Sequence, residues 1–138
     1  MIPPETSFQW GDYLALAKEW LAGTDASPYP QATYRSIISR AYYGVFHASF
    51  ALAQTLGLES TQSAGDHYRV RKFFENRGRV AGQLSQLLRS LYDFRVSADY
   101  AIQPGNPVSE DARPIAQQVL LDAHKAMTMI EYLQARAK

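Results

Sequence analysis

The stretch SRAYYGVFHASFALA, residues 39–53, decides how this chain folds. It lies in a run from about Gln31 to Leu56 that two prolines precede and Gly57 follows. Apolar side chains recur in this run at helical spacing. They are Tyr34, Ile37, Ile38, Ala41, Tyr42, Val45, Phe46, Leu52, Ala53 and Leu56. A face this wide predicts a central helix with neighbours on more than one side.

Segments with the same periodicity flank this central helix. One is expected from about Ser7 to Ala22, capped by Thr6 or Ser7, and another from about Val80 to Tyr100. The loop GLESTQSAGD, residues 57–66, separates the central helix from a short helix, HYRVRKFFENR, at residues 67–77. Asp66 is the expected N-cap of that short helix.

The last helix follows a turn-rich loop, IQPGNPVSE, and continues to the C-terminus. Asp111 is its expected N-cap, which places Pro114 at the third helical position, where no intrahelical bond is lost. No stretch alternates with period two. We therefore predict an all-α fold, an up-and-down bundle of four long helices plus one short helix, in a single domain over residues 1–138.

Composition narrows the classes of function. The 138 residues contain 46% apolar and 20% charged side chains, as expected of a folded domain. The lack of cysteine excludes disulfides, thiolate metal sites and cysteine nucleophiles, and suits a reducing compartment. We expect no signal peptide and no membrane span, and hence a cytoplasmic protein. With a net charge of only +1, nucleic-acid binding would need a local basic patch.

Arg40 and His47 are the first candidate functional pair. Seven residues correspond to about 700° of helix rotation, so the two side chains lie about 20° apart, two turns along one face. Tyr43 and Gly44 lie between them, and Gly44 suggests that something approaches the helix closely there. The pair could act on a phosphate, or it could be a packed histidine and a paired arginine.

A second candidate lies in LRSLYDFRVSADY, residues 88–100. Arg95 falls on the apolar seam of the predicted helix, where a charge is costly unless it is paired. Asp99 is one turn further on and can pair with it. Tyr92 shares the face of these two residues. The group is either a structural ion pair or a polar cluster that faces a cleft or a second subunit.

The short helix carries the third candidate, HYRVRKFFENRGR, residues 67–79. Its five positive charges include Arg69, Arg71 and Lys72, and they are set against Glu75 alone. Such charges could contact phosphates, and an exposed ring such as that of Tyr68 could stack on a base. The alternative is a solvated helix surface. No histidine pair at metal-ligand spacing occurs, so we expect neither a metal nor a cofactor.

Three runs together resemble the HEPN domain, most closely its small stand-alone members. They are YRSIISRAYYGVFHASFALA, then HYRVRKFF, then LRSLYDFRVSADY, and the likeness spans roughly residues 31–133. The resemblance implies a helical bundle that forms a homodimer. It also implies pairing with a minimal nucleotidyltransferase as toxin and antitoxin. Many HEPN proteins are metal-independent ribonucleases with an arginine, four to six residues and a histidine, a spacing that Arg40 and His47 match at its upper limit.

Two functions remain open on these grounds. In a ribonuclease, His47 would be a general acid or base, Arg40 would stabilise phosphate charge, and Arg69, Arg71 and Lys72 would hold RNA. In a non-catalytic dimer, Tyr43, His47, Arg95 and Asp99 would form an internal polar network. Such a dimer would bind a nucleotidyltransferase partner or a nucleotide.

Overall fold

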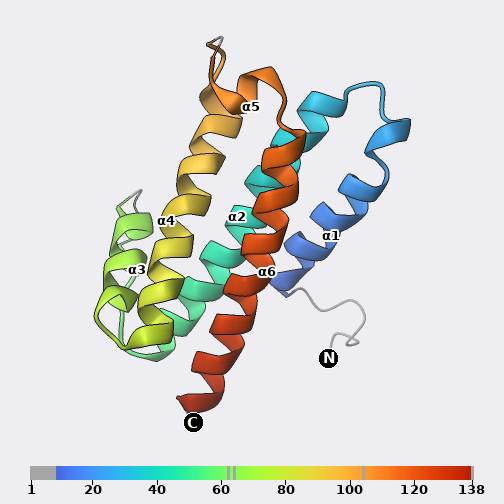
Figure 1. The fold of residues 1–138 in the computed structure, drawn as a ribbon. Helices are drawn as coiled ribbons and strands as arrows, with labels where there is room; N and C mark the ends of the chain where they lie inside the picture. Colours follow the sequence, from blue (N-terminus) through green and yellow to red (C-terminus); the bar gives the residue numbers. More distant parts are fainter. Residues whose placement is uncertain (1–8, 62, 64, 104, 138) are drawn as a thin grey trace.

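The computed structural model describes residues 9–61, 63, 65–103 and 105–137, and these residues form helices and connecting loops without a strand. The helices are α1 (Gly11–Ala22), α2 (Pro30–Thr55), α3 (Asp66–Glu75), α4 (Arg79–Tyr100), α5 (Pro107–Glu110) and α6 (Arg113–Arg136), with a 3₁₀ turn, η2 (Thr24–Ala26), after α1. Four of them, α1, α2, α4 and α6, run alternately up and down (Figure 1). The all-α prediction is confirmed.

Helix α2 is the centre of the bundle. It packs against α1, α4 and α6, and α3 lies outside the bundle against α4 (Figure 1). Its side chains Ile37, Ile38 and Val45 are fully buried, and the helix contacts three long neighbours, as its wide apolar face predicted. Burial of one such side chain contributes about 1.5–3 kcal/mol. The core is therefore organised around the stretch that the sequence singled out.

Several predicted helix ends are wrong. Helix α1 begins at Gly11 and not near Ser7, because Gln9 and Trp10 are not helical; the expected caps Thr6 and Ser7 lie outside the described residues. The carboxylate of Asp12 accepts a hydrogen bond from the Gln9 N–H at 2.9 Å and so stabilises this start. The turn-rich loop before α6 also contains one helical turn, α5, capped by the Asn106 side chain.

Asp66 is not an N-cap. It is the first residue of α3, and its buried carboxylate faces the preceding loop. It accepts hydrogen bonds from the N–H and the hydroxyl of Thr61 and from the hydroxyl of Ser60. These bonds hold the pKa of Asp66 well below its usual range. The carboxylate thus closes the loop between α2 and α3 and does not cap its own helix.

Asp111 is not the predicted N-cap of α6 but the residue before the N-cap. The N-cap of α6 is Ala112, and Pro114 is the second helical residue, not the third. The Asp111 carboxylate still accepts from the Arg113 N–H, and the Gln31 side chain bridges Asp111 and the Ala112 N–H. The start of α6 is therefore fixed by α2 as well as by its own sequence.

Candidate functional site

The stripe of α2 that carries Arg40 and His47 is where the start of α1 packs. A Cβ added at Gly44 would lie 3.0 Å from the Trp10 carbonyl oxygen and 3.2 Å from the Tyr13 Cβ. The close approach that Gly44 suggested is therefore made by the chain's own first helix. The His47 ring stacks on the Trp10 ring, with centroids 4.3 Å apart, and the Arg40 guanidinium lies 5.5 Å from the Tyr13 ring centre.

Arg40 and His47 consequently face different surroundings. Arg40 is exposed and lines a polar groove of about 390 Å³ between α2 and α4, together with Tyr43 and Asp99. His47 is half-buried near the start of α1. The two side chains are about 10 Å apart along the helix axis, since each residue adds 1.5 Å. One subunit alone does not bring them to one point.

The structure brings a second histidine, His67, to His47. Both imidazoles pack on the Phe46 ring, His67 in a stack with centroids 4.1 Å apart and His47 edge-on at 5.0 Å. The Tyr42 hydroxyl lies 2.5 Å from Nδ1 of His67. Sequence reasoning gave His67 no role, because α3 meets α2 across a loop and no spacing along the chain signals that contact. The only signal was its place at the head of HYRVRKFF.

Both histidines are biased toward the neutral form. Burial lowers the pKa of His47 below its ordinary value of 6.5. Burial also lowers the pKa of His67, and the charges of Arg95 and Arg71 add to the effect. Burial raises the pKa of Tyr42, so its phenol keeps the proton. We therefore assign Tyr42 as the donor to Nδ1, which leaves the proton of neutral His67 on Nε2.

The tyrosines that surround His67 also surround the Arg95 guanidinium, and the group of His47, His67 and these side chains is called the histidine site below. Arg95 is only 8% exposed, and its guanidinium carbon lies within 6 Å of three ring centres, those of Tyr42, Tyr43 and Tyr92. Its Nη1 pairs with Asp99 at 3.4 Å, as the sequence predicted, and its Nε has no acceptor among the described residues. The Asp99 carboxylate lies at the partly exposed edge of the group.

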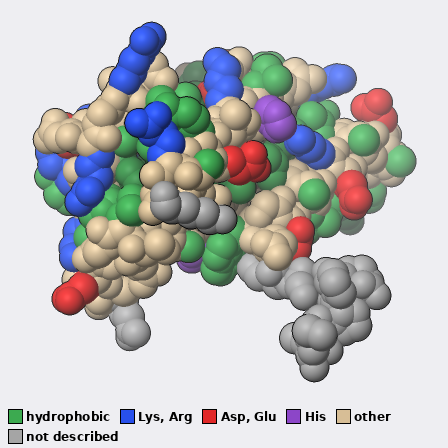
Figure 2. Space-filling view, turned by 90° about the horizontal axis from the view of Figure 1, so that it is seen from below, with side chains coloured by type: hydrophobic (Ala, Val, Ile, Leu, Met, Phe, Trp, Pro, Cys, Tyr) green, Lys and Arg blue, Asp and Glu red, His purple; other side chains and the backbone are tan. Residues whose placement is uncertain are grey.

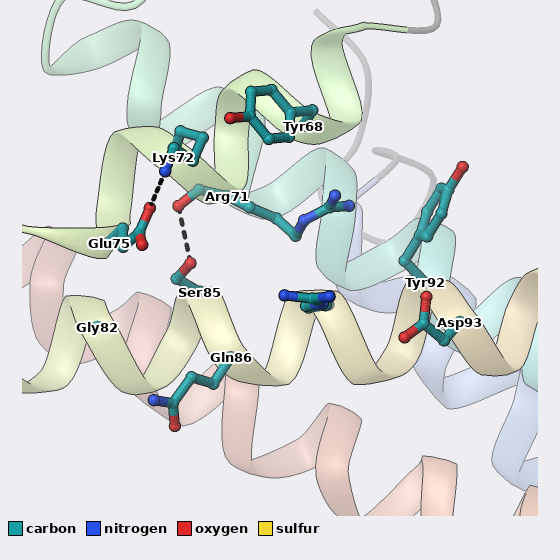
Figure 3. A pocket seen from close by; sticks show the side chains of 10 residues that line it. Tyr68, Arg71, Lys72, Glu75, Gly82, Ser85, Gln86, Tyr92 and Asp93 are labelled. Atoms are coloured by element: carbon teal, nitrogen blue, oxygen red, sulfur yellow. Dashed lines mark hydrogen bonds and ion pairs between the residues drawn. The ribbon is translucent and has the colours of Figure 1, made fainter.

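A larger groove of about 570 Å³ lies between α3 and α4 (Figure 3). It is lined by Tyr68, Arg71, Lys72 and Glu75 on α3 and by Gly82, Ser85, Gln86, Arg89, Tyr92 and Asp93 on α4. Arg71 and Tyr92 belong to both the groove and the surroundings of Tyr42 and His67. The groove and the histidine site are therefore neighbours.

The three predicted RNA-binding residues do not share one surface. Arg71 and Lys72 line the α3–α4 groove, whereas Arg69 pairs with Asp66 at 3.2 Å and donates to the Glu59 carbonyl. Arg89 joins the groove from α4, and the sequence reasoning did not include it. Figure 2 shows Lys and Arg side chains gathered on the side of the molecule where α3 and α4 lie.

The part of the chain that the structure describes has neither a metal-ion cluster nor a membrane-spanning helix. No group of three or more histidine or acidic side chains there is placed to hold a metal ion. None of the described helices combines the length and hydropathy needed to cross a bilayer.

Comparison with known proteins gives one informative match. The chain is 32% identical over 82 residues to "Putative toxin MJ0605" of Methanocaldococcus jannaschii. The matched segment spans 59% of this chain and 60% of that protein. No family profile matches the chain, and no solved structure matches it significantly. The similarity covers part of each protein and leaves the chemistry to be argued from the site.

Proposed function

We propose that this chain is a HEPN-like toxin that acts as a metal-independent endoribonuclease and is neutralised by a nucleotidyltransferase antitoxin. One observation carries the proposal. His47 and His67 meet at the Phe46 ring, both biased to the neutral form, with the charges of Arg71 and Arg95 close by. The similarity to the archaeal protein named "Putative toxin MJ0605" supports the toxin part of this proposal. A toxin that cleaves cellular RNA would act in the cytoplasm.

The two histidines supply the proton transfers that cleavage at a ribose 2′-hydroxyl requires. Neutral His47 accepts the 2′-hydroxyl proton as O2′ bonds to phosphorus. His67 acts in its imidazolium form, in which Nδ1–H donates to the Tyr42 hydroxyl, and it gives its Nε2 proton to the departing 5′-oxygen as the P–O5′ bond breaks; it is left as the neutral imidazole. The products are a 2′,3′-cyclic phosphate and a 5′-hydroxyl, so water is not a reactant in this step, and the two histidines account for both protons. Arg95 lies where a guanidinium can offset the charge that develops on the phosphate.

Arg40 requires a second subunit in this scheme. Because it lies two turns from His47, it would reach the phosphate held by the other copy of a homodimer. The polar groove that contains Arg40, Tyr43 and Asp99 is open on the surface and would meet that copy. This arrangement gives each cleavage site two histidines from one subunit and one arginine from the other.

A cleavage assay in the presence of EDTA tests the proposal. We expect His47→Ala to lower the rate of RNA cleavage by about 100-fold or more, since a positioned acid or base contributes that much. His67→Ala should have a similar effect and Arg40→Ala a smaller one. His124→Ala is the matched control, because His124 is exposed on α6 and lies outside the site. Cleavage that survives His47→Ala in a folded protein would contradict the assignment.

The alternative is a non-catalytic helical dimer that binds the nucleotidyltransferase. The stacking of the Trp10 ring on the His47 ring favours this alternative, because an imidazole covered by another ring can contribute to packing without taking part in catalysis. Arg95→Leu separates the two functions. If Arg95 has a structural role, removing it leaves the Asp99 carboxylate without its ion-pair partner and lowers the free energy of unfolding. If Arg95 serves catalysis, an apolar side chain in this buried position leaves stability equal or higher and only the cleavage rate falls.

A further inference from the structure

We infer that the α3–α4 groove binds one nucleotide unit, with Arg71 holding its phosphate and Tyr68 stacking on its base. The inference deepens the proposed function and rests on it for RNA as the source of that nucleotide; a free mononucleotide has the same chemistry. The groove is distinct from the histidine site, to which Arg71 and Tyr92 connect it.

Arg71 is a cation that lacks an anion. Among the described residues its guanidinium forms no ion pair, and its Nη1 is buried without a hydrogen-bond partner. A guanidinium in this state is costly unless something binds it. The ring centres of Tyr92 and Tyr68, at 5.1 and 5.9 Å, compensate only part of that cost. A phosphate offers the two parallel acceptors that the planar fork of arginine matches.

The other charged side chains of the groove do not neutralise Arg71. Lys72 is neutralised by Glu75 at 2.7 Å, so the pair adds little net charge. Arg89 is exposed on the opposite wall, and no described residue forms an ion pair with it. Asp93 is the remaining carboxylate and lies one turn beyond Arg89, where it can accept a bond from a sugar hydroxyl. Arg95 adds positive potential from behind Tyr92.

Shape and aromatic surface favour a nucleotide over a bare phosphate. The volume of about 570 Å³ lies within the range of small-molecule sites, about 300–1,000 Å³. Tyr68 is 56% exposed, so part of its ring surface faces solvent, although Arg71 and Lys72 lie 5.9 and 5.8 Å from the ring centre. Figure 3 shows the Arg71 side chain running between Tyr68 and Tyr92. A base on Tyr68 and a phosphate at Arg71 would thus be adjacent, and stacking on such a ring contributes about 1–3 kcal/mol.

Calorimetric titration of the whole chain tests the site with three probes. They are inorganic phosphate, AMP, and a short single-stranded RNA whose 2′-O-methyl groups prevent cleavage. We expect AMP to bind more tightly than phosphate. We expect Arg71→Gln to weaken AMP binding by about tenfold or more, since it removes a charge-assisted pair. Tyr68→Ala should weaken AMP and RNA binding and leave phosphate binding nearly unchanged.

Two variants provide the controls. Arg79→Gln removes the same charge at an exposed position outside the groove and should change AMP affinity by less than about twofold. Arg71→Lys keeps the positive charge but loses the planar guanidinium that can donate two parallel hydrogen bonds. Its affinity for AMP should lie between those of the wild type and Arg71→Gln. Circular dichroism confirms that each variant is folded.

The outcomes separate this inference from the proposed function. If none of the three probes binds, or if Arg71→Gln binds AMP as the wild type does, the nucleotide site is wrong even when RNA cleavage is observed. If AMP binds through Arg71 but no RNA is cleaved, the site stands and the ribonuclease assignment fails. Binding of AMP without binding of the RNA would identify a free nucleotide as the ligand and overturn RNA as its source.

Discussion

His67 shows how the chemistry of one residue is set by its neighbours. Its imidazole lies between the Phe46 ring and the Tyr42 hydroxyl, with two guanidinium charges nearby. Apolar contact and positive charge both disfavour the imidazolium. Asp66, the adjacent residue, acts in the opposite direction but is engaged by the loop hydroxyls. The imidazolium form of His67 is thereby the minor species at neutral pH, and it gives up its proton more readily than a free imidazolium.

The stability of the protein should depend on pH through these histidines. Because the pKa of His47 and of His67 is lowered in the folded state, the unfolded chain takes up protons first as the pH falls below 6.5. We expect the free energy of unfolding in urea to be constant from pH 8 to 7 and to fall toward pH 5. The slope is at most about 1.4 kcal/mol per pH unit for each histidine.

Replacing one histidine at a time shows which side chain causes the fall in the free energy of unfolding below pH 7. His67→Gln should flatten the decline, whereas His124→Gln on the exposed face of α6 should not. Asp66 does not interfere in this range, because its lowered pKa removes stability only at more acidic pH, below the usual range of a carboxyl group. A profile that is flat between pH 7 and 5 in the wild type would contradict the burial-induced shifts.

At the scale of the elements, the contact between α1 and α2 decides what surrounds His47. Gly44 lets the backbone at Trp10 approach α2, and the approach places the Trp10 ring over the imidazole. A glycine inside a helix costs about 0.5–1 kcal/mol relative to alanine. Here the cost is offset by the packing of α1 against the central helix, where Leu14 and Ala17 are buried.

Gly44→Ala should therefore destabilise the protein although alanine favours helices. The added Cβ would lie 3.0 Å from a backbone oxygen, which cannot move without shifting α1, so we expect a loss of about 1–3 kcal/mol in urea unfolding. Gly82→Ala in α4 is the matched control. Its Cβ would lie 3.4 Å from the Glu75 carbonyl, and we expect it to be neutral or stabilising. Equal effects of the two substitutions would show that packing at Gly44 is not tight.

For the whole molecule, charge is distributed more unevenly than the total suggests. The net charge is +1, yet Arg71, Lys72 and Arg89 line one groove, and the basic side chains gather on the side of α3 and α4 (Figure 2). Acidic side chains are spread over the same view. A chain that is close to neutral can therefore still present a basic surface to an anionic polymer.

This distribution predicts a modest salt dependence of RNA binding. If Arg71 and Arg89, the groove cations that have no ion pair among the described residues, each contact one phosphate, the logarithm of the association constant should fall with the logarithm of salt concentration with a slope of about −1.4. Fluorescence anisotropy with the 2′-O-methylated RNA measures it. Arg89→Gln should reduce the magnitude of the slope, and Arg113→Gln at the start of α6 should not. A slope near zero would exclude phosphate contacts as the source of affinity.

Much of this protein was determined by its sequence alone. Hydrophobic periodicity gave the all-α fold, the central helix and the Arg95–Asp99 pair, because these depend on neighbours three or four residues apart. The predicted caps of α3 and α6 are wrong, since Asp66 and Gln31 bond to groups outside their own helices. Only the tertiary structure decided that Trp10 covers His47, that His67 joins it, and that Arg69 leaves the groove that Arg71 lines. Those contacts depend on how helices pack across loops, and the spacing of residues along the chain does not encode the angle or depth of that packing.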